Sequence, residues 1–456
     1  MKWGFVLDQD ACIGCHACTV ACKQENDVPL GAFRTWVKWI EHGQFPETRR
    51  SAAVLRCNHC EDAPCVEICP TIALYKRPDG IVDLDPARCI GCASCLQACP
   101  YDAIYIDPFK GTAAKCHFCA HRMEVNLAPA CVSVCPEQAI KVVDLDDERT
   151  RAQLSDLKAT VRKPARGTKP QTYYLGADPL ALDPLAVDGT RTLSHAEVPN
   201  PMPAHGTAEA RAVYDVPRPR EWGWQIAAYL WTKAIAAGAL IAAAVFPDVG
   251  GHEAALGWIS LLAIVATGVL LVTDLHQPKR FYYLLIKPNF RSWLVRGAYV
   301  LGLHALLSFG WGFGLLNAAT SDFMKVLSVG VGIMTAIYTA FLFAQARGRE
   351  LWSEDHLLVV VLWAQALAAA AGLAWWFGTA GRVWAVVFLA VTGVAHFVKP
   401  PTRAARRAHD LMVQYTAYWA GVLLAVLAVG YPPLALASFA FLDYVYIKAG
   451  QEVPLS

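Results

Sequence analysis

Sixteen cysteines, all between Cys12 and Cys135 of this 456-residue chain, are the residues with the clearest chemistry. They form four groups of four, and in the first and third groups the successive gaps are two, two and three residues. The second group widens its middle gap to four residues and the fourth group to eleven. Thiolates at such spacings hold four-iron, four-sulfur (4Fe-4S) clusters, which carry single electrons. The groups are Cys12, Cys15, Cys18, Cys22; Cys57, Cys60, Cys65, Cys69; Cys89, Cys92, Cys95, Cys99; and Cys116, Cys119, Cys131, Cys135.

Two other uses of cysteine explain this pattern less well. Disulfide frameworks belong to oxidising compartments and small secreted domains, and we expect no signal peptide ahead of the first cysteine. Zinc sites use paired cysteines with longer gaps between the pairs, whereas three of the four groups here close with Cys-Pro. We expect His16, His59 and His117 to be spacers near a cluster, because every group already has four thiolates.

Composition divides the chain into a polar, cysteine-rich part and an apolar part that begins at Trp222. The formal net charge of +2 and the lack of a basic stripe argue against nucleic-acid binding. Within residues 1–165, short β-rich pieces at 80–84, 103–106 and 139–143 alternate with cysteine loops, and 147–162 is predicted to be helical. Residues 166–220 are rich in Pro, Gly, Asp and Ala, so we expect an extended linker or docking arm there.

Residues 221–456 are predicted to form an all-α membrane domain. A helix needs roughly 20 apolar residues to cross a bilayer, and small residues such as Gly310 and the alanines at 368–371 suit close helix packing. Eight stretches are candidates: 223–246, 254–275, 292–315, 324–346, 356–377, 383–398, 411–430 and 432–448.

Positive charge predicts which way the bundle faces. With eight spans, the loops on the side of the cysteine domain hold eleven Lys or Arg residues and the opposite loops only Lys325 and Arg382. Since Lys and Arg gather on the cytoplasmic side, we expect a multi-pass protein of the inner (cytoplasmic) membrane with its iron–sulfur domain facing the cytoplasm. The alternative is that these cations dock a partner or the acidic rim of the cluster domain. They are Lys279, Arg280, Lys287, Arg291, Arg347, Arg349, Lys399, Arg403, Arg406, Arg407 and Lys448.

Both halves resemble known modules. Residues 1–165, with the segment 167–175, resemble the four-cluster electron-transfer subunit of complex iron–sulfur molybdoenzymes, the group that includes dimethyl sulfoxide, polysulfide and tetrathionate reductases. From residue 222 the chain resembles the quinone-reactive membrane subunit of the polysulfide reductase family. That likeness rests on Asp274-Leu275, Pro278, Arg280, Ser292-Trp293 and Tyr338-Thr339.

The resemblance implies an α+β ferredoxin-like domain carrying four 4Fe-4S clusters, followed by an all-α eight-helix transmembrane bundle without haem. Most members of the group work on the outer face of the membrane, which departs from the orientation expected here, although its sulfite-oxidising members work inside. The two modules are usually separate chains and here they are joined.

The fourth cysteine of a run reaches across to a neighbouring cluster, and the resemblance implies how the groups pair. It also implies that the cluster with Cys116 lies nearest the membrane and the cluster with Cys12 nearest the catalytic partner. The implied ligand sets are Cys12, Cys15, Cys18, Cys135; Cys116, Cys119, Cys131, Cys22; Cys57, Cys60, Cys65, Cys99; and Cys89, Cys92, Cys95, Cys69.

The quinone site is sought among polar residues of the spans, because a buried ionisable group in a membrane is costly and marks function. Tyr338 matches the quinone-contacting tyrosine of the family and leads the candidates, with Lys233 and His304 beside it. Gln225 and Tyr229 precede Lys233 at steps of four residues, which places all three on one helical stripe, and Asp274 is a candidate proton relay. Lys233 could instead snorkel, and His304 could merely bond a neighbouring helix.

These features predict an electron-transfer and quinone-reactive subunit of a membrane-bound oxidoreductase, using menaquinone or ubiquinone. Substrate catalysis is expected on another chain, which the resemblance implies is a molybdenum or tungsten bis-pterin (molybdopterin-type) subunit. The alternatives are the equivalent subunit of a membrane-bound hydrogenase, a redox-driven ion-translocating module, or a redox sensor. The spans hold few buried acids, Asp274 and Asp443, which disfavours ion pumping. The substrate, the direction of electron flow and the quinone type are not readable from the residues.

Overall fold

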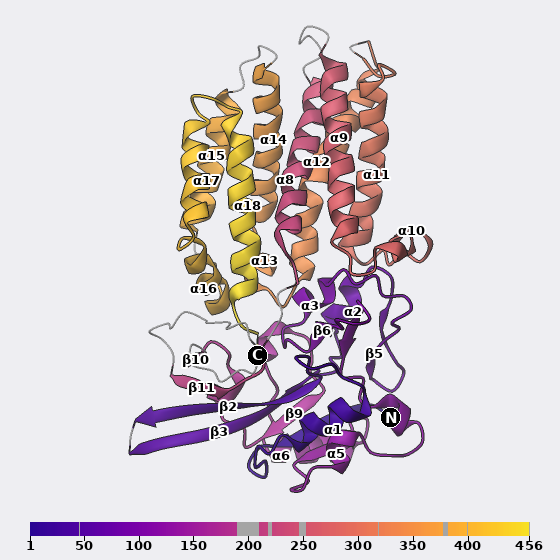
Figure 1. Cartoon of the computed structure of the whole chain (residues 1–456), viewed down its shortest axis with the longest axis vertical. Helices are drawn as coiled ribbons and strands as arrows, with labels where there is room; N and C mark the ends of the chain where they lie inside the picture. Colours follow the sequence, from indigo (N-terminus) through magenta and orange to yellow (C-terminus); the bar gives the residue numbers. More distant parts are fainter. Residues whose placement is uncertain are drawn as a thin grey trace. The chain divides into compact units, whose positions relative to one another are not determined.

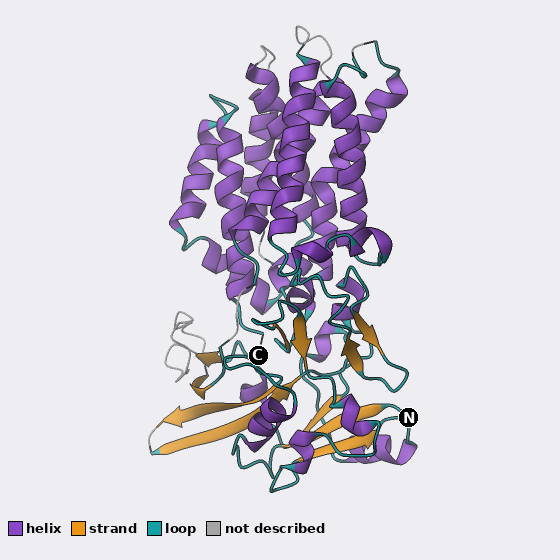
Figure 2. Cartoon of the chain, turned by 45° about the vertical axis from the view of Figure 1, so that its right-hand side comes forward, coloured by secondary structure: helices purple, strands orange, loops and turns teal. Residues whose placement is uncertain are grey.

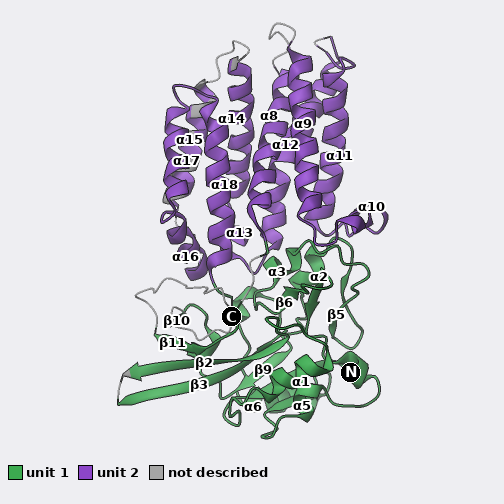
Figure 3. Ribbon diagram, in the orientation of Figure 1, with its two compact units in different colours: residues 1–221, 454–456 green, residues 222–453 purple. Residues whose placement is uncertain are grey.

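A computed structural model describes residues 1–44, 46–188, 209–217, 221–245, 252–317, 319–376, 382–398 and 400–455. The chain divides into two compact units (Figure 3). Unit 1 comprises residues 1–221 and 454–456, and unit 2 comprises residues 222–453. The described strands all belong to unit 1, whereas the long helices belong to unit 2 (Figure 2). The boundary at residue 221 agrees with the change in composition at Trp222.

The centre of unit 1 is a three-stranded sheet in the order β8-β1-β9. Strand β1 (Trp3–Asp8) pairs antiparallel with β8 (Ile140–Asp144) and parallel with β9 (Thr172–Leu175). Its apolar residues Phe5, Val6 and Leu7 are buried, as befits the middle strand of a covered sheet. The sheet therefore joins the start of the chain to segments that follow the last cysteine.

Cysteine loops and short elements surround this sheet. The loops need left-handed backbone to curl, and Gly14 (φ 66°) and Gly91 (φ 69°) supply it at the same place in the first and third groups. The helices are α1 (Ala17–Glu25), α2 (Pro64–Ile68), α3 (Ser94–Ala98), α4 (Ala120–Met123), α5 (Ala130–Ser133) and α6 (Glu148–Asp156). Two small hairpins pair β4 (Leu74–Lys76) with β5 (Val82–Leu84) and β6 (Ile104–Ile106) with β7 (Ala113–Lys115). The expected strands and the expected helix after the clusters are thus present: two strands and the helix are shorter than expected, and β8 (Ile140–Asp144) is shifted by one residue.

The expectation of an extended linker over 166–220 is wrong for much of that segment. It contributes β9 to the central sheet, and a second sheet has the order β10-β11-β2-β3. In this second sheet β10 (Val187–Asp188) and β11 (Ala210–Tyr214) extend the long hairpin of β2 (Thr35–Gln44) and β3 (Glu47–Arg56). Two short helices, η1 (Pro164–Arg166) and α7 (Pro179–Leu182), lie before β10 in the sequence. Such short strands form because an existing sheet edge pairs with them, so composition alone does not reveal them. The rest of the expected linker, 189–208 and 218–220, lies outside the described residues.

Each of the eight predicted membrane stretches overlaps one main helix of unit 2, with ends that differ by a few residues (Figure 1). Among the described residues, five helices are long and apolar enough to cross a membrane, or six if α16 and α17, bent by 72°, form one span. A membrane-embedded helical bundle is therefore confirmed, while the count of eight crossings stays a prediction. The main helices are α8 (Trp224–Val245), α9 (Glu253–Thr273), α11 (Trp293–Gly312), α12 (Asp322–Gln345), α14 (Leu358–Trp376), α15 (Arg382–Phe397), α17 (Thr416–Leu427) and α18 (Leu434–Glu452). Between them lie η2 (Pro278–Arg280), α10 (Tyr283–Ile286), α13 (Glu350–Ser353) and α16 (Arg403–Met412).

Helix α8 is the centre of the bundle and packs against α9, α12, α14 and α18. Its small residues permit this close packing. A Cβ added at Gly238 would lie 2.6 Å from the backbone nitrogen of Ala370 on α14, so only glycine fits there. The alanines at 368–371 are buried at the same contact, which confirms the predicted role of small residues in helix packing.

Candidate functional site

None of the sixteen cysteines forms a disulfide, and all of them lie in the described part of unit 1. Twelve thiols are buried, Cys12, Cys92 and Cys135 are half-buried, and Cys15 is exposed. Burial raises the pKa of the Cys18 thiol to about 11. Thiols in such surroundings are protonated at neutral pH unless a metal binds them, so cluster binding releases protons here.

The fold brings the thiols together across the chain. Cys22 lies among thiols of the fourth group, since Cys116, Cys131 and Cys119 all act electrostatically on it. All four line one small cavity. In the same way the strongest of these effects on the Cys99 thiol comes from Cys57, in the second group. The sets that interact are Cys12, Cys15, Cys18, Cys135; Cys22, Cys116, Cys119, Cys131; Cys57, Cys60, Cys65, Cys99; and Cys69, Cys89, Cys92, Cys95.

Electrostatic interactions also link successive thiol sets and are consistent with a row of four. Cys18 interacts with Cys131 of the second set. Cys116 of that set interacts with Cys57 of the third, and Cys65 of the third with Cys95 of the fourth. The set with Cys116 thus interacts with both the first and the third set, and the expectation that it lies nearest the membrane stays a prediction. Spacing could not reveal these interactions, because they depend on how the loops fold over one another.

Backbone N–H groups point at several of the sulfurs. Leu74 N–H donates to Cys69 Sγ at 3.4 Å, and Ala113 N–H donates to Cys89 Sγ at 3.4 Å. Ala139 N–H donates to Cys135 Sγ at 3.3 Å. Hydrogen bonds to cluster sulfurs stabilise the reduced, more negative state and tune its potential. The donor set and its surroundings therefore fit 4Fe-4S clusters.

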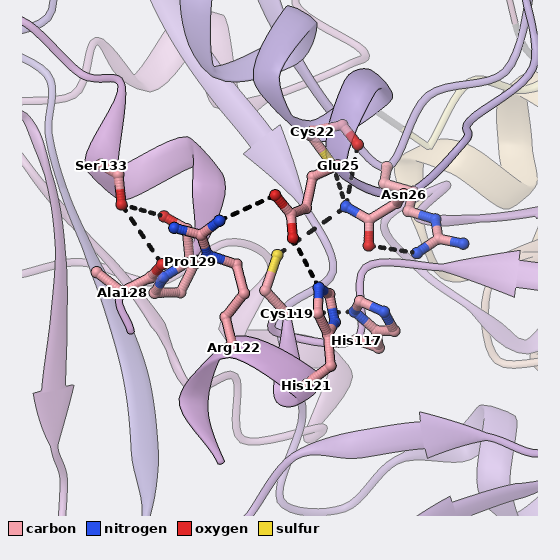
Figure 4. Close-up of polar contacts among 11 residues, drawn as sticks. Cys22, Glu25, Asn26, His117, Cys119, His121, Arg122, Ala128, Pro129 and Ser133 are labelled. Atoms are coloured by element: carbon pink, nitrogen blue, oxygen red, sulfur yellow. Dashed lines mark hydrogen bonds and ion pairs between the residues drawn. The ribbon is translucent and has the colours of Figure 1, made fainter. Parts of the chain in front are cut away.

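Polar side chains around Cys22 and Cys119 form a connected network (Figure 4). The Asn26 amide faces Cys22 Sγ at 3.7 Å and Cys119 Sγ at 3.9 Å. Its oxygen accepts from Arg34 at 3.2 Å, which holds the amide nitrogen toward the sulfurs. Glu25 at the end of α1 pairs with Arg122 at 2.9 Å and with the neighbouring His121 at 2.8 Å. The network ties α1 to α4 across the second thiol set.

Arg56, which the sequence patterns did not single out, is fully buried beside the thiols. Its Nη1 lies 3.4 Å from Cys131 Sγ, and its Nη2 donates to Thr35 Oγ1 at 3.1 Å. The guanidinium also lies over the Phe5 ring, 4.4 Å from the centroid. Among the described residues no carboxylate forms an ion pair with it. In the sequence, Arg56 is visible only as an arginine between an apolar run and Cys57. Rules based on cysteine spacing do not consider such a residue.

In unit 2 the structure brings Lys233, Tyr229 and Tyr338 together, and all three are buried. The Lys233 ammonium donates to Ala336 O at 3.0 Å and to the Thr339 hydroxyl. It lies 4.8 Å from the Tyr338 ring centroid and 5.8 Å from that of Tyr229. Lys233 therefore does not snorkel to an interface: its amine lies inside the bundle, against oxygens and ring faces.

The other candidates lie apart from this group. His304 bonds Ser260 Oγ and Thr335 Oγ1, each at 2.9 Å, so both ring nitrogens join helices α9, α11 and α12. This contact matches the packing interpretation of His304. Gln225 is half-buried in the first turn of α8, and Asp274 caps the end of α9. Asp274 does act electrostatically on Tyr229, which keeps it a candidate relay.

The predicted cationic loops lie at one end of the bundle, around α10, α13 and α16 (Figure 1). In α16, Ala405, Ala408 and Leu411 face inward while its arginines are more exposed. Arg349 is an exception because it is buried and donates to Gln451 O and Val453 O at the end of α18. Lys399 lies outside the described residues.

Comparison with known proteins identifies both units. Residues 52–145 match the model of the 4Fe-4S dicluster domain, and residues 3–24 match a 4Fe-4S binding domain. Residues 214–437 match the model of polysulphide reductase, NrfD.

Relatives of this protein include three named reductase subunits. The tetrathionate reductase B subunit of Salmonella typhimurium is 42% identical over 190 residues, 40% of this chain and 76% of the relative. The polysulfide reductase B polypeptide of Wolinella succinogenes is 39% identical over 38% of this chain and 94% of the relative. The thiosulfate reductase electron transfer subunit PhsB of Salmonella typhi is 43% identical over 36% of this chain and 88% of the relative. The chain therefore belongs to the family of 4Fe-4S subunits of these reductases, joined to a polysulphide reductase (NrfD) membrane domain.

Proposed function

We propose that this chain is the electron-transfer and quinone-reactive subunit of a membrane-bound oxidoreductase. The observation that carries the proposal is a row of four thiol sets joined, on one chain, to a helix bundle with a lysine buried against two tyrosines. Named relatives are subunits of tetrathionate, polysulfide and thiosulfate reductases, which favours this function over a hydrogenase subunit.

Each thiol set would hold one 4Fe-4S cluster, with the fourth cysteine of every group crossing to its partner group. When bound, such clusters supply one-electron carriers. The chain's own part is to place them in sequence, and the contacts Cys18–Cys131, Cys116–Cys57 and Cys65–Cys95 support that order. The set with Cys12 and the set with Cys89 would form the two ends of the row.

The quinone would bind beside Tyr338, with Lys233 and Tyr229 around its head. A quinone carbonyl needs a hydrogen-bond donor, and its reduction needs protons. The buried ammonium and the phenol hydroxyls can supply both, and Asp274 would connect this group to the end of α9. Neither menaquinone nor ubiquinone is favoured by these contacts.

Substrate chemistry would take place on a second polypeptide that carries a molybdenum or tungsten bis-pterin. Every cysteine of this chain already belongs to a thiol set, and the relatives of the cluster unit are subunits of reductases. The cationic end of the bundle would face the cytoplasm. A cysteine introduced at Ala404 should then be protected from an impermeant thiol label added outside intact cells, whereas one at Gly250 should react; the reverse pattern would overturn this orientation.

The experiment that tests the function combines metal analysis with a single variant. The purified complex should contain about sixteen iron atoms on this chain, and a content far below that would remove the four-cluster assignment. Tyr338→Phe should lose quinone-linked turnover and keep electron transfer to an artificial dye. The matched control is Tyr299→Phe on the exposed side of α11, which should change neither. Unchanged quinone turnover in Tyr338→Phe would remove Tyr338 from the site.

A further inference from the structure

Unit 2 contains a second feature that the proposed quinone site does not use, a cavity of about 530 Å³. It lies between α14, α17 and α18, and neither Lys233 nor Tyr338 lines it. Most of its wall is apolar, with Leu362, Val422 and Leu442 among the lining residues. Cavities of roughly 300–1,000 Å³ with an apolar wall and a few convergent polar groups are typical of small-molecule sites.

Two buried side chains that line this cavity each carry an oxygen without a hydrogen-bond partner among the described residues. Gln365 is 2% exposed and Asp443 is 6% exposed. The Gln365 amide donates to Asp443 Oδ1 at 2.9 Å, which holds the two side chains together. Asp443 Oδ2 and Gln365 Oε1 are then left without a partner among the described residues. A buried acceptor left unpaired costs free energy, so this wall is arranged for a group that donates hydrogen bonds.

The rest of the wall defines what else the occupant must be. A second polar pair, in which the Tyr446 hydroxyl donates to Asp355 Oδ2 at 2.9 Å, lies on the same cavity. Val398 and Trp419 also line it and are half exposed, so the cavity reaches the surface of the bundle. An apolar molecule dissolved in the membrane can enter by that route, provided that one end of it carries donors.

Charge favours a neutral donor over a cation. Asp443 already interacts electrostatically with the Lys233 ammonium inside the bundle. A second cation in an apolar wall would be expensive to desolvate, whereas a hydroxyl group can donate to one of the free oxygens at less cost. A membrane quinol offers one ring hydroxyl to the polar wall and an isoprenoid tail to the apolar remainder.

We propose that this cavity is a second quinol-binding site, in which the free oxygen of Asp443 or of Gln365 accepts a hydrogen bond from a quinol hydroxyl. The inference rests on the proposed function, because a quinone-reactive subunit works among membrane quinols. It adds a site at α14, α17 and α18 that is selective for the reduced form of the carrier. The oxidised quinone has only acceptors and would leave both oxygens unpaired.

The test measures binding of heptyl-hydroxyquinoline N-oxide, a fluorescent quinol analogue with a hydroxyl donor, to the purified full-length complex. Val422→Trp fills the cavity from its wall, and the matched control Leu423→Trp lies on the same helix with its side chain exposed. We expect Val422→Trp to lose one bound probe per chain and the control to lose none. Gln365→Leu should weaken that same site by about tenfold or more. Cluster absorbance and the thermal midpoint establish that each variant is folded.

Three outcomes would overturn the inference. In the first, Val422→Trp and Leu423→Trp bind the same amount of probe with the same affinity. In the second, all probe binding is lost in Tyr338→Phe and none in Val422→Trp; the proposed function then stands and only the second site fails. In the third, mass spectrometry of the intact complex finds a phospholipid that quinol does not displace and that Val422→Trp excludes. Failure of the proposed function is seen separately, as quinone-linked turnover that survives Tyr338→Phe.

Discussion

Replacing Arg56 by glutamine should lower the reduction potential of the cluster that we propose is held by Cys22, Cys116, Cys119 and Cys131. The substitution removes a positive charge that lies 3.4 Å from Cys131 Sγ and retains a side chain able to donate to Thr35. Because adding an electron makes a cluster more negative, a nearby cation stabilises the reduced state. Loss of the cation therefore makes reduction harder.

The magnitude follows from Coulomb's law. At an effective dielectric constant of about 20, two unit charges 3.4 Å apart interact by roughly 5 kcal/mol. The added electron is spread over the cluster, and most of the cluster lies further from Arg56 than Cys131 Sγ does. We therefore expect the arginine to stabilise the added electron by about 2 kcal/mol. For a one-electron couple this corresponds to a decrease of about 90 mV. Arg56 is fully buried, so solvent does little to screen the effect.

The assay is a potentiometric titration of the purified complex, followed by electron paramagnetic resonance of the reduced clusters. Iron content should be unchanged in Arg56→Gln. Arg56→Lys serves as the matched control, because it keeps the charge and loses the planar contact with Phe5. The reasoning fails if Arg56→Gln shifts no cluster by more than about 20 mV, or if both variants shift the potential equally, since packing rather than charge would then be responsible.

The remaining predictions concern three other contacts. Asn26→Leu removes the amide N–H groups that face two cluster sulfurs, so the potential of that cluster should fall by tens of mV in the same titration. A hydrogen bond from His121 holds the pKa of Glu25 below its ordinary value. The stabilising contact of Glu25 is therefore present at neutral pH and is lost as the pH falls through that lowered pKa. Glu25→Gln should release iron faster than the wild type at about pH 7, and this difference should shrink as the pH falls through the lowered pKa of Glu25, as measured by cluster absorbance. Gly297→Ala places a Cβ 2.2 Å from the Tyr338 ring and should reduce quinone-linked turnover about tenfold with dye reduction intact; Gly302→Ala on the same helix meets open space and should change neither, and equal losses in both would refute the contact.

Local patterns in the sequence were sufficient to predict that the chain divides into two units and that the first unit binds iron–sulfur clusters. The spacing of sixteen cysteines indicates clusters because each ligand loop is short and its geometry is set by neighbouring residues. Apolar stretches near 20 residues predict membrane helices for the same reason, since a helix satisfies its own backbone hydrogen bonds. The main helices α8, α9, α11 and α12 accordingly lie where the sequence places them.

Contacts between distant segments decided the rest. The row order of the thiol sets depends on Cys18 meeting Cys131 and Cys65 meeting Cys95, which no spacing rule encodes. The strands after the clusters form only because β1 and β2 offer edges to pair with, so their composition resembles a linker. Residue type alone could not separate His304, whose ring is bonded on both sides, from Lys233, which sits against Tyr338.

Arg56 and Asp443 show most clearly the difference between what residue type indicates and what tertiary packing determines. An arginine before a cysteine and an aspartate near a helix end are ordinary in a sequence, and their types indicate only that each is charged. Tertiary packing places the arginine 3.4 Å from a thiol of the second set. It also puts the aspartate on a cavity wall, with one carboxylate oxygen that has no hydrogen-bond partner among the described residues. The cost of burying a charge or an unpaired acceptor depends on everything around it, and only the folded chain determines those surroundings.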